Sequence, residues 1–195
     1  MITFLSSKIA DFLYKRKIIS YEYIEICKYG YEVLFFNLLN ALIVLLLGYV
    51  LNKLLYSVVF FFVFATVRQY CGGYHSNSTV FCTALYITIY LIVILLTTCS
   101  VTKIYFNIIT DIIFCMCYLS AAISFSPIEN ANKPLSDNEK AKHKKSSIIL
   151  GILLTLVSAF SYKVNMHISA VISLTLFMVT ILMIIAKHIG KEESS

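Results

Sequence analysis

The sequence of 195 residues contains no tryptophan and few charged side chains. Charged residues make up 13% of the chain and hydrophobic residues make up 59%. A soluble domain has about 25% charged and about 45–50% apolar residues, so this composition excludes an ordinary soluble protein. The apolar residues also form long blocks, which is typical of a protein that crosses a membrane several times. Without tryptophan, the 14 tyrosines are expected to take the interfacial positions.

Three further features are missing from the sequence. No small-residue cleavage site follows an apolar run near the N-terminus, so we expect no cleavable signal peptide. The six cysteines do not show the loop-based pairing of a secreted disulfide scaffold. No internal repeat or domain boundary is visible, which predicts a single membrane-embedded domain over residues 1–195. The net charge of +6 is expected to hold loops on the cytoplasmic side, with no binding of nucleic acid.

The apolar blocks predict an all-α, polytopic membrane protein with about six membrane segments. Residues 1–31 are expected to form an amphipathic helical region on the membrane surface. The bundle is expected over residues 33–186, with a charged cytoplasmic tail at 187–195. The predicted spans are Val33–Leu51, Leu54–Val67, Thr79–Thr98, Ile104–Ser126, Ser146–Ser161 and Ile168–Ala186.

The second predicted span is unusually short. Leu54–Val67 has 14 residues, which is about 21 Å of helix against a hydrocarbon core about 30 Å thick. It must therefore continue through Tyr70, meet a thinned bilayer, or turn back as a re-entrant element.

The basic residues predict the orientation of these spans. With a cytoplasmic N-terminus and six crossings, 13 of the 16 basic residues lie inside and 3 lie outside, namely Lys53, Lys103 and Lys163. This asymmetry favours cytoplasmic N- and C-termini and places Arg68–Ser78 at the cytoplasmic face. The polar segment Pro127–Lys145 falls on the same side. We interpret its Lys140–Lys145 cluster as a determinant of topology and lipid contact, with attraction of an acidic peptide as the alternative.

One segment, Arg68–Cys82, combines reactive and flexible residues between two apolar blocks. Polar groups at a bilayer edge are costly, so they are candidates for function. A cysteine nucleophile needs a base within hydrogen-bond reach, and His75 and Cys82 are the candidates. On one continuous helix these two residues would lie about 10.5 Å apart in rise, so the helix should break between them.

Ser76–Ser78 favours such a break because serine and asparagine are poor in helix interiors and good at helix starts. Cys82 would then lie in or near the first turn of the third span, where the positive helix end stabilises negative charge on sulfur. Gly72–Gly73 would let the backbone turn tightly beside a substrate. A zinc site with Cys71, His75 and Cys82 is an alternative, but it lacks a fourth ligand.

Two further polar residues have more than one interpretation. Arg68 either snorkels to the surface or holds a peptide carboxylate or phosphate. Asp111 lies within the fourth apolar block and is expensive to bury. It is a candidate for polar support of His75 or Arg68, or for lining a cavity with Asn107, and we rank packing or a cavity role above catalysis.

The chain resembles the AgrB family, the accessory gene regulator protein B membrane endopeptidases of Gram-positive quorum sensing. The resemblance rests on an Arg-x-x-x-Gly-Gly-x-His-x6-Cys pattern, matched by Arg68, Gly72, Gly73, His75 and Cys82. A Pro-x-x-x-x-Asn-Lys-Pro loop is matched by residues 127–134, and Tyr29–Glu32 gives a weaker match. The resemblance implies Cys82 as nucleophile and His75 as base, with Arg68 and Gly73 needed around them.

The resemblance also implies a substrate and a reaction. The substrate would be an AgrD-like propeptide on the cytoplasmic leaflet of the cell membrane. The enzyme would remove its C-terminal tail and promote closure of a thiolactone or lactone ring. No metal or cofactor is expected, and a homodimer is compatible with the sequence.

Two other classes of protein remain open. A non-catalytic exporter of a small peptide would move its substrate without shortening it. A structural or interaction protein of the membrane would depend on neither His75 nor Cys82.

Overall fold

The computed structural model describes residues 2–72, 79–99, 106–128 and 136–192 of the chain. Within these ranges the chain forms seven α-helices and one short 3-10 helix, with no β-strand. Six of the helices are long and apolar enough to cross a membrane. The prediction of an all-α, polytopic membrane protein is therefore confirmed.

The chain forms two compact units, residues 1–46 and residues 47–195. The first unit contains α1 (Ile2–Lys15), a 3-10 helix at Tyr21–Tyr23 and most of α2 (Ile24–Val50). The chain turns after α1 at Lys17, whose φ is 58°. α2 begins before the predicted border at Tyr31 because nothing between Ile24 and Val33 interrupts it, and a single glycine there costs only about 1 kcal/mol. Residues 24–31 therefore continue into the helix of the first span.

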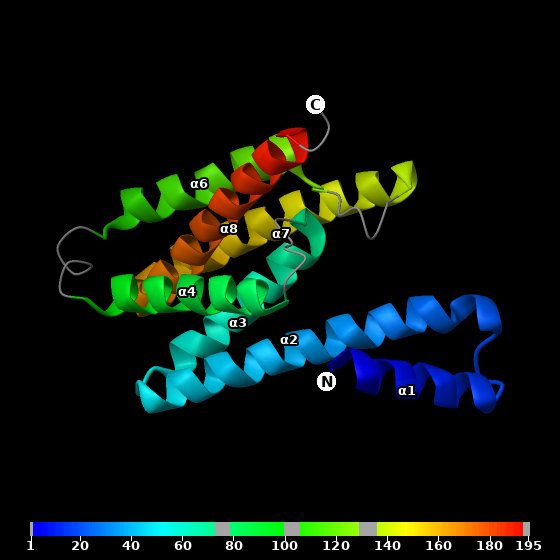
Figure 1. Ribbon diagram of the computed structural model, residues 1–195. Coiled ribbons are helices and arrows are strands. Elements are labelled where there is room, and N and C mark those ends of the chain that lie inside the picture. The colour runs from blue at the N-terminus through cyan, green and yellow to red at the C-terminus, as the bar shows by residue number, and fades with distance from the viewer. Residues whose placement is uncertain (1, 73–78, 100–105, 129–135, 193–195) are drawn as a thin grey trace. The chain divides into compact units, whose positions relative to one another are not determined.

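The second unit contains the other five helices: α3 (Leu54–Cys71), α4 (Thr79–Thr98), α6 (Ile108–Phe125), α7 (Asp137–Val164) and α8 (Met166–Glu192). α8 packs against each of the other four, and Figure 1 shows it running alongside α6 and α7. In its most apolar stretch 67% of the residues are buried, against 17–39% for the other four. α8 is therefore the central helix of this unit.

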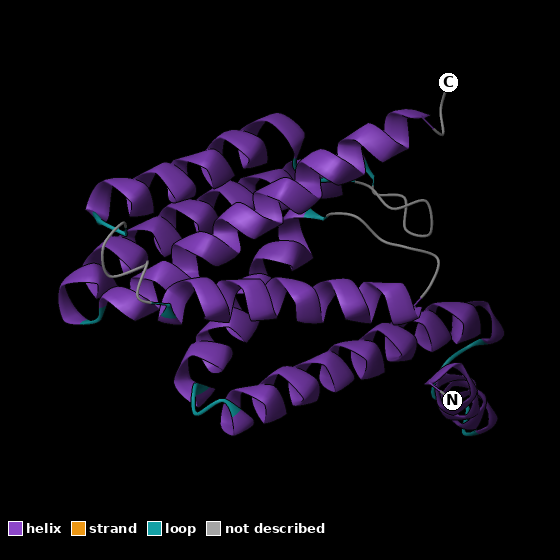
Figure 2. Cartoon of the chain, turned by 60° about the vertical axis from the view of Figure 1, so that its left-hand side comes forward, coloured by secondary structure: helices purple, strands orange, loops and turns teal. Residues whose placement is uncertain are grey.

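The second predicted span is longer in the structure, where it corresponds to α3. It has 18 residues and ends at Cys71, so at 1.5 Å per residue it is about 27 Å long. The span therefore continues past Val67 as one helix and does not turn back. α4 has the predicted borders, Thr79 and Thr98. Figure 2 shows these helices from a second direction.

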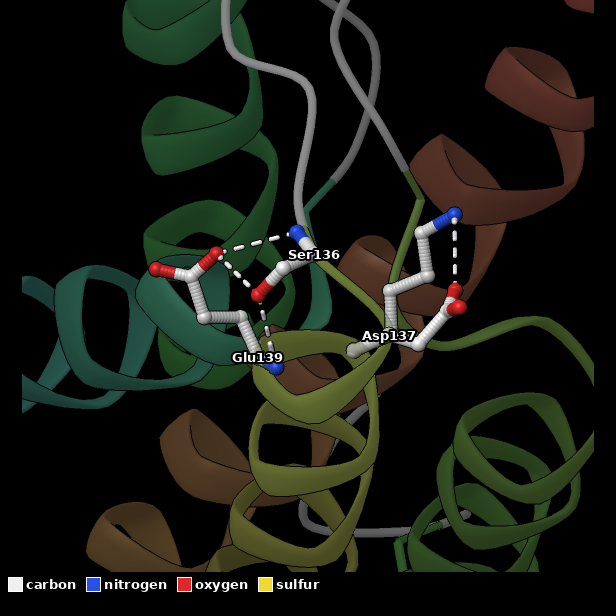
Figure 3. Close-up of polar contacts among 4 residues, drawn as sticks. Ser136, Asp137 and Glu139 are labelled. Carbon is white, nitrogen blue, oxygen red and sulfur yellow. Dashed lines mark hydrogen bonds and ion pairs between the residues drawn. The ribbon is translucent and has the colours of Figure 1, made fainter.

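α7 begins earlier than predicted, at Asp137 and not at Ser146. The Ser136 amide and hydroxyl donate to the Glu139 carboxylate at 2.9 and 2.8 Å, and the Glu139 amide donates to the Ser136 hydroxyl (Figure 3). This is a capping box, which fixes the start of a helix. Polarity misled the prediction, because lysine, glutamate and alanine favour a helix as strongly as apolar residues do.

Candidate active site

Arg68 and Cys82 are brought together by the ends of two helices. Arg68 lies in the last turn of α3, and Cys82 is the fourth residue of α4. The guanidinium is close enough to the thiols of Cys82 and Cys71 to interact with both electrostatically. Arg68 and Cys82 are half-buried, whereas Cys71 is fully buried. A cation and a partly accessible thiol therefore share one site at the helix ends.

The guanidinium is also held by an aromatic side chain on its own helix. Its central carbon lies 5.6 Å from the ring centroid of Phe64, one turn earlier on α3. A cation over an aromatic face is attracted by the ring quadrupole. Arg68 is therefore fixed at the end of the helix, beside the cysteines, and does not simply extend into solvent.

Gly72 ends α3 in a conformation that other residues rarely adopt. Its φ is 73° and its ψ is −153°, and its amide donates to the carbonyl of Arg68 at 3.2 Å. A Cβ atom at this position would collide with the carbonyl oxygen of Ile128. The backbone therefore turns tightly at this glycine and a second segment approaches it closely; its place beside a substrate stays a prediction.

That second segment follows α6 and belongs to the proline-containing loop noted in the sequence. Ile128 forms a parallel backbone bridge with Gly72, and its amide donates to the carbonyl of Cys71 at 3.0 Å. The two sequence patterns that carry the family resemblance therefore meet in the described part of the structure. We call this end of the second unit, comprising Arg68–Gly72, Cys82 and Ser126–Ile128, the motif end.

α7 also contributes to the motif end. The Ser147 hydroxyl donates to the buried Ser126 hydroxyl at 2.8 Å. The ring of His143 lies 5.8 Å from the ring of Tyr70, the residue before Cys71. These contacts were not predicted, because His143 and Ser147 lie in a polar stretch with no recognisable pattern. Only the early start of α7 brings them alongside α3 and α6.

His75 and Gly73 lie outside the described residues, so the His75–Cys82 dyad stays a prediction. In the described residues α3 ends at Cys71, α4 begins at Thr79, and Cys82 falls in the first turn of α4. Within the described ranges no group of three or more histidine, cysteine, aspartate or glutamate residues could hold a metal ion.

Asp111 lies in the first turn of α6, whereas the bridge to Gly72 follows the last turn of that helix. Asp111 and Phe125 are 14 positions apart, which corresponds to about 21 Å of helix. The carboxylate is buried and accepts hydrogen bonds from Ser158 and Ser169, each at 2.8 Å. These contacts tie α6 to α7 and α8, and a role of Asp111 in supporting His75 stays a prediction.

Comparison with known proteins covers most of the chain. The family model for accessory gene regulator B matches residues 6–184. AgrB-like protein 2 of Clostridium perfringens (strain 13 / Type A) is 35% identical over 136 residues, or 67% of this chain and 63% of the relative. Accessory gene regulator protein B of Staphylococcus aureus (strain MRSA252) is 24% identical over 153 residues, or 77% and 79%. The chain thus matches less than two thirds of the length of the Clostridium relative, and no solved structure matches it. On the family match, the chain belongs to the accessory gene regulator B (AgrB) family.

Proposed function

We propose that the protein is a membrane cysteine endopeptidase that cleaves the C-terminal tail from an AgrD-like propeptide in quorum sensing. The observation that carries the proposal is the placement of Cys82 in the first turn of α4, within electrostatic reach of the Arg68 guanidinium. Both a helix N-terminus and a nearby cation stabilise negative charge on sulfur. This environment suits a nucleophilic cysteine better than an inert one.

In the proposed first step, His75 takes the proton of the Cys82 thiol as the sulfur attacks the scissile carbonyl. The amide C–N bond breaks, a thioester forms with Cys82, and His75 gives the proton to the leaving amine. The Arg68 guanidinium stabilises the negative charge that passes from sulfur to the carbonyl oxygen. The acidic tail leaves with the new amine.

Ring closure follows from the same thioester. A thiol of the substrate attacks the acyl carbon, His75 takes the proton of that thiol, and Cys82 leaves as its thiolate. One thioester replaces another, so this exchange lies near energetic balance. Holding the substrate thiol beside the acyl group favours the ring over hydrolysis. A substrate hydroxyl would give a lactone by the same route.

The location of the chemistry follows from the proposed orientation. Both termini and the motif end face the cytoplasm, where an amphipathic propeptide can lie on the inner leaflet. Cys82 then lies near the membrane surface, within reach of a peptide that never crosses the bilayer. Several exposed lysines on the first turns of α7 lie at the same end as Arg68, which suits a substrate with an acidic tail.

A cleavage assay in liposomes tests the proposal. A synthetic AgrD-like propeptide is incubated with wild type, Cys82→Ala or His75→Ala, and the released tail is measured by mass spectrometry. Cys99→Ala is the matched control, because Cys99 lies at the far end of α4. We expect cleavage by wild type and by the control only, with no effect of a metal chelator.

Two other results would reject parts of the proposal. Cleavage by both Cys82→Ala and His75→Ala would reject the Cys82–His75 dyad. Transfer of an uncut peptide across the liposome membrane, with no released tail, would favour the non-catalytic exporter.

A further inference from the structure

Asp111 is a buried carboxylate shared by three helices. It lies on α6 and is only 1% exposed. Its Oδ1 atom accepts hydrogen bonds from Ser158 of α7 and Ser169 of α8, each at 2.8 Å. The Ser158 hydroxyl also lies 3.1 Å from the Ser169 hydroxyl and 3.2 Å from the Ser169 carbonyl oxygen. Four oxygen atoms of three residues therefore meet inside the bundle, at the end opposite to the motif end.

We propose that Asp111, Ser158 and Ser169 form a binding site for a small monovalent cation, Na⁺. Ionisable side chains within membrane helices are candidates for ion binding when they face the bundle interior. The site would use both carboxylate oxygens, the two hydroxyl oxygens and the Ser169 carbonyl. It is distinct from the proposed peptidase centre and does not depend on the peptidase reaction.

The hydrogen-bond balance of the cluster favours a cation. Asp111 Oδ2 is buried and has no hydrogen-bond partner among the described residues. No lysine or arginine in those ranges forms an ion pair with the carboxylate. A buried carboxylate oxygen without a partner or a counter-charge is costly. A cation would bind both carboxylate oxygens and offset the buried negative charge.

The donor set also selects the kind of cation. The proposed donors are all oxygen, which suits hard cations. The Cys115 thiol lies within electrostatic reach of Asp111, but hard cations do not select sulfur. A single carboxylate neutralises one positive charge, whereas Ca²⁺ sites in proteins use more oxygen ligands and usually several carboxylates. The paired oxygens lie only 2.8–3.2 Å apart. Such short separations fit Na⁺ better than the larger K⁺.

Occupation of this site would fasten α6, α7 and α8 to one another. Each of the three helices contributes one ligand residue. A ligand that binds the folded state and not the unfolded state raises stability with its concentration. Na⁺ should therefore stabilise this bundle more than K⁺ or an organic cation at the same ionic strength.

The test uses the purified full chain in lipid nanodiscs. The thermal unfolding midpoint is measured in NaCl, KCl and choline chloride at equal ionic strength. Wild type should unfold on the order of several degrees higher in NaCl, with a saturable dependence on Na⁺. Asp111→Asn should lose this difference. Asp11→Asn is the matched control, because Asp11 is exposed on α1, and it should keep the difference.

A milder variant and a direct measurement cover the case in which Asp111→Asn does not fold. Ser169→Ala should need roughly tenfold more Na⁺ for half of the stabilisation, the effect of losing about 1.4 kcal/mol of binding. Radioactive ²²Na⁺ should bind wild type with one site per chain and should not be displaced by K⁺. Equal midpoints for wild type in the three salts would overturn the proposal. So would an Asp111→Asn variant that keeps its sodium dependence, or the absence of saturable ²²Na⁺ binding.

Discussion

The amide of Ile128 donates a hydrogen bond of 3.0 Å to the carbonyl of Cys71, so the segment after α6 is docked on the end of α3. The bridge between Ile128 and Gly72 continues this contact. It joins the two segments by their backbones, and therefore depends on the absence of a side chain at position 72.

Gly72→Ala should weaken this junction and abolish cleavage. The φ and ψ of Gly72 lie in a region that is essentially restricted to glycine, and forcing another residue into it costs on the order of 1–3 kcal/mol. The new Cβ would also displace the Ile128 carbonyl. We expect a lower unfolding midpoint and little or no released tail in the liposome assay. Gly30→Ala is the control, since a Cβ there meets nothing within 4 Å, and equal losses in both variants would contradict the prediction.

Arg68→Gln should reduce cleavage by on the order of 10–100-fold while the fold is retained. The substitution removes the cation beside Cys82, and a thiolate near a positive charge reacts faster than an isolated thiol. The rate of Cys82 alkylation by iodoacetamide, read by mass spectrometry, should fall in parallel.

Arg16→Gln serves as the matched control for Arg68→Gln, because Arg16 is exposed in the turn after α1. It should leave both rates unchanged. An unchanged alkylation rate in Arg68→Gln would show that Arg68 does not raise the reactivity of the Cys82 thiol.

The fold was largely predictable because membrane spans are encoded by local composition. Thr79 and Thr98 were placed correctly as the borders of α4, since polar residues flank an uninterrupted apolar block there. The start of α7 was missed because a capping box and helix-forming polar residues extend a helix beyond its apolar part.

The site was predictable only where its residues follow one another in the sequence. Arg68, Gly72 and Cys82 form a local pattern, and the structure places Arg68 and Cys82 together. The contacts of Ile128 with Gly72 and of His143 with Tyr70 connect distant parts of the chain. They depend on how three helices pack, which a single sequence does not specify.

His143→Ala should reduce cleavage several-fold, whereas His143→Phe should retain most of it. The His143 ring packs against Tyr70, which lies between Arg68 and Gly72. Aromatic pairs contribute about 0.5–1.5 kcal/mol beyond their buried area, so losing the ring should loosen this turn of α3. Rates at saturating and limiting propeptide would show a lower kcat with little change in KM.

The control for His143 is His188→Ala, since His188 is exposed on α8. It should cleave as wild type does. A His143→Phe variant as inactive as His143→Ala would indicate that imidazole chemistry, and not ring packing, is needed at this position.

Replacing Ser136 and Glu139 together by alanine should destabilise the start of α7 by about 1 kcal/mol. Both side chains satisfy amides that are otherwise unpaired at the helix N-terminus (Figure 3). Hydrogen exchange of the first α7 amides should accelerate, with little change in the apolar part of the helix. Asn138→Ala lies between the two capping residues and should leave exchange unchanged, and protection that survives the double substitution would argue against the capping box.

Because α7 starts early, its cluster of basic residues lies on a regular helix and not on a loop. The nine residues from Asp137 to Lys145 extend over about 13 Å of helix. Lys140 and His143 are half-buried and Ser147 is buried, so these three positions mark the face turned toward the bundle. Lys142, Lys144 and Lys145 are exposed and lie on the other faces of the α7 helix. The helix therefore fixes where these ammonium groups lie along its axis and around it. Selectivity among anionic ligands then depends on the spacing of their charges as well as on the total charge.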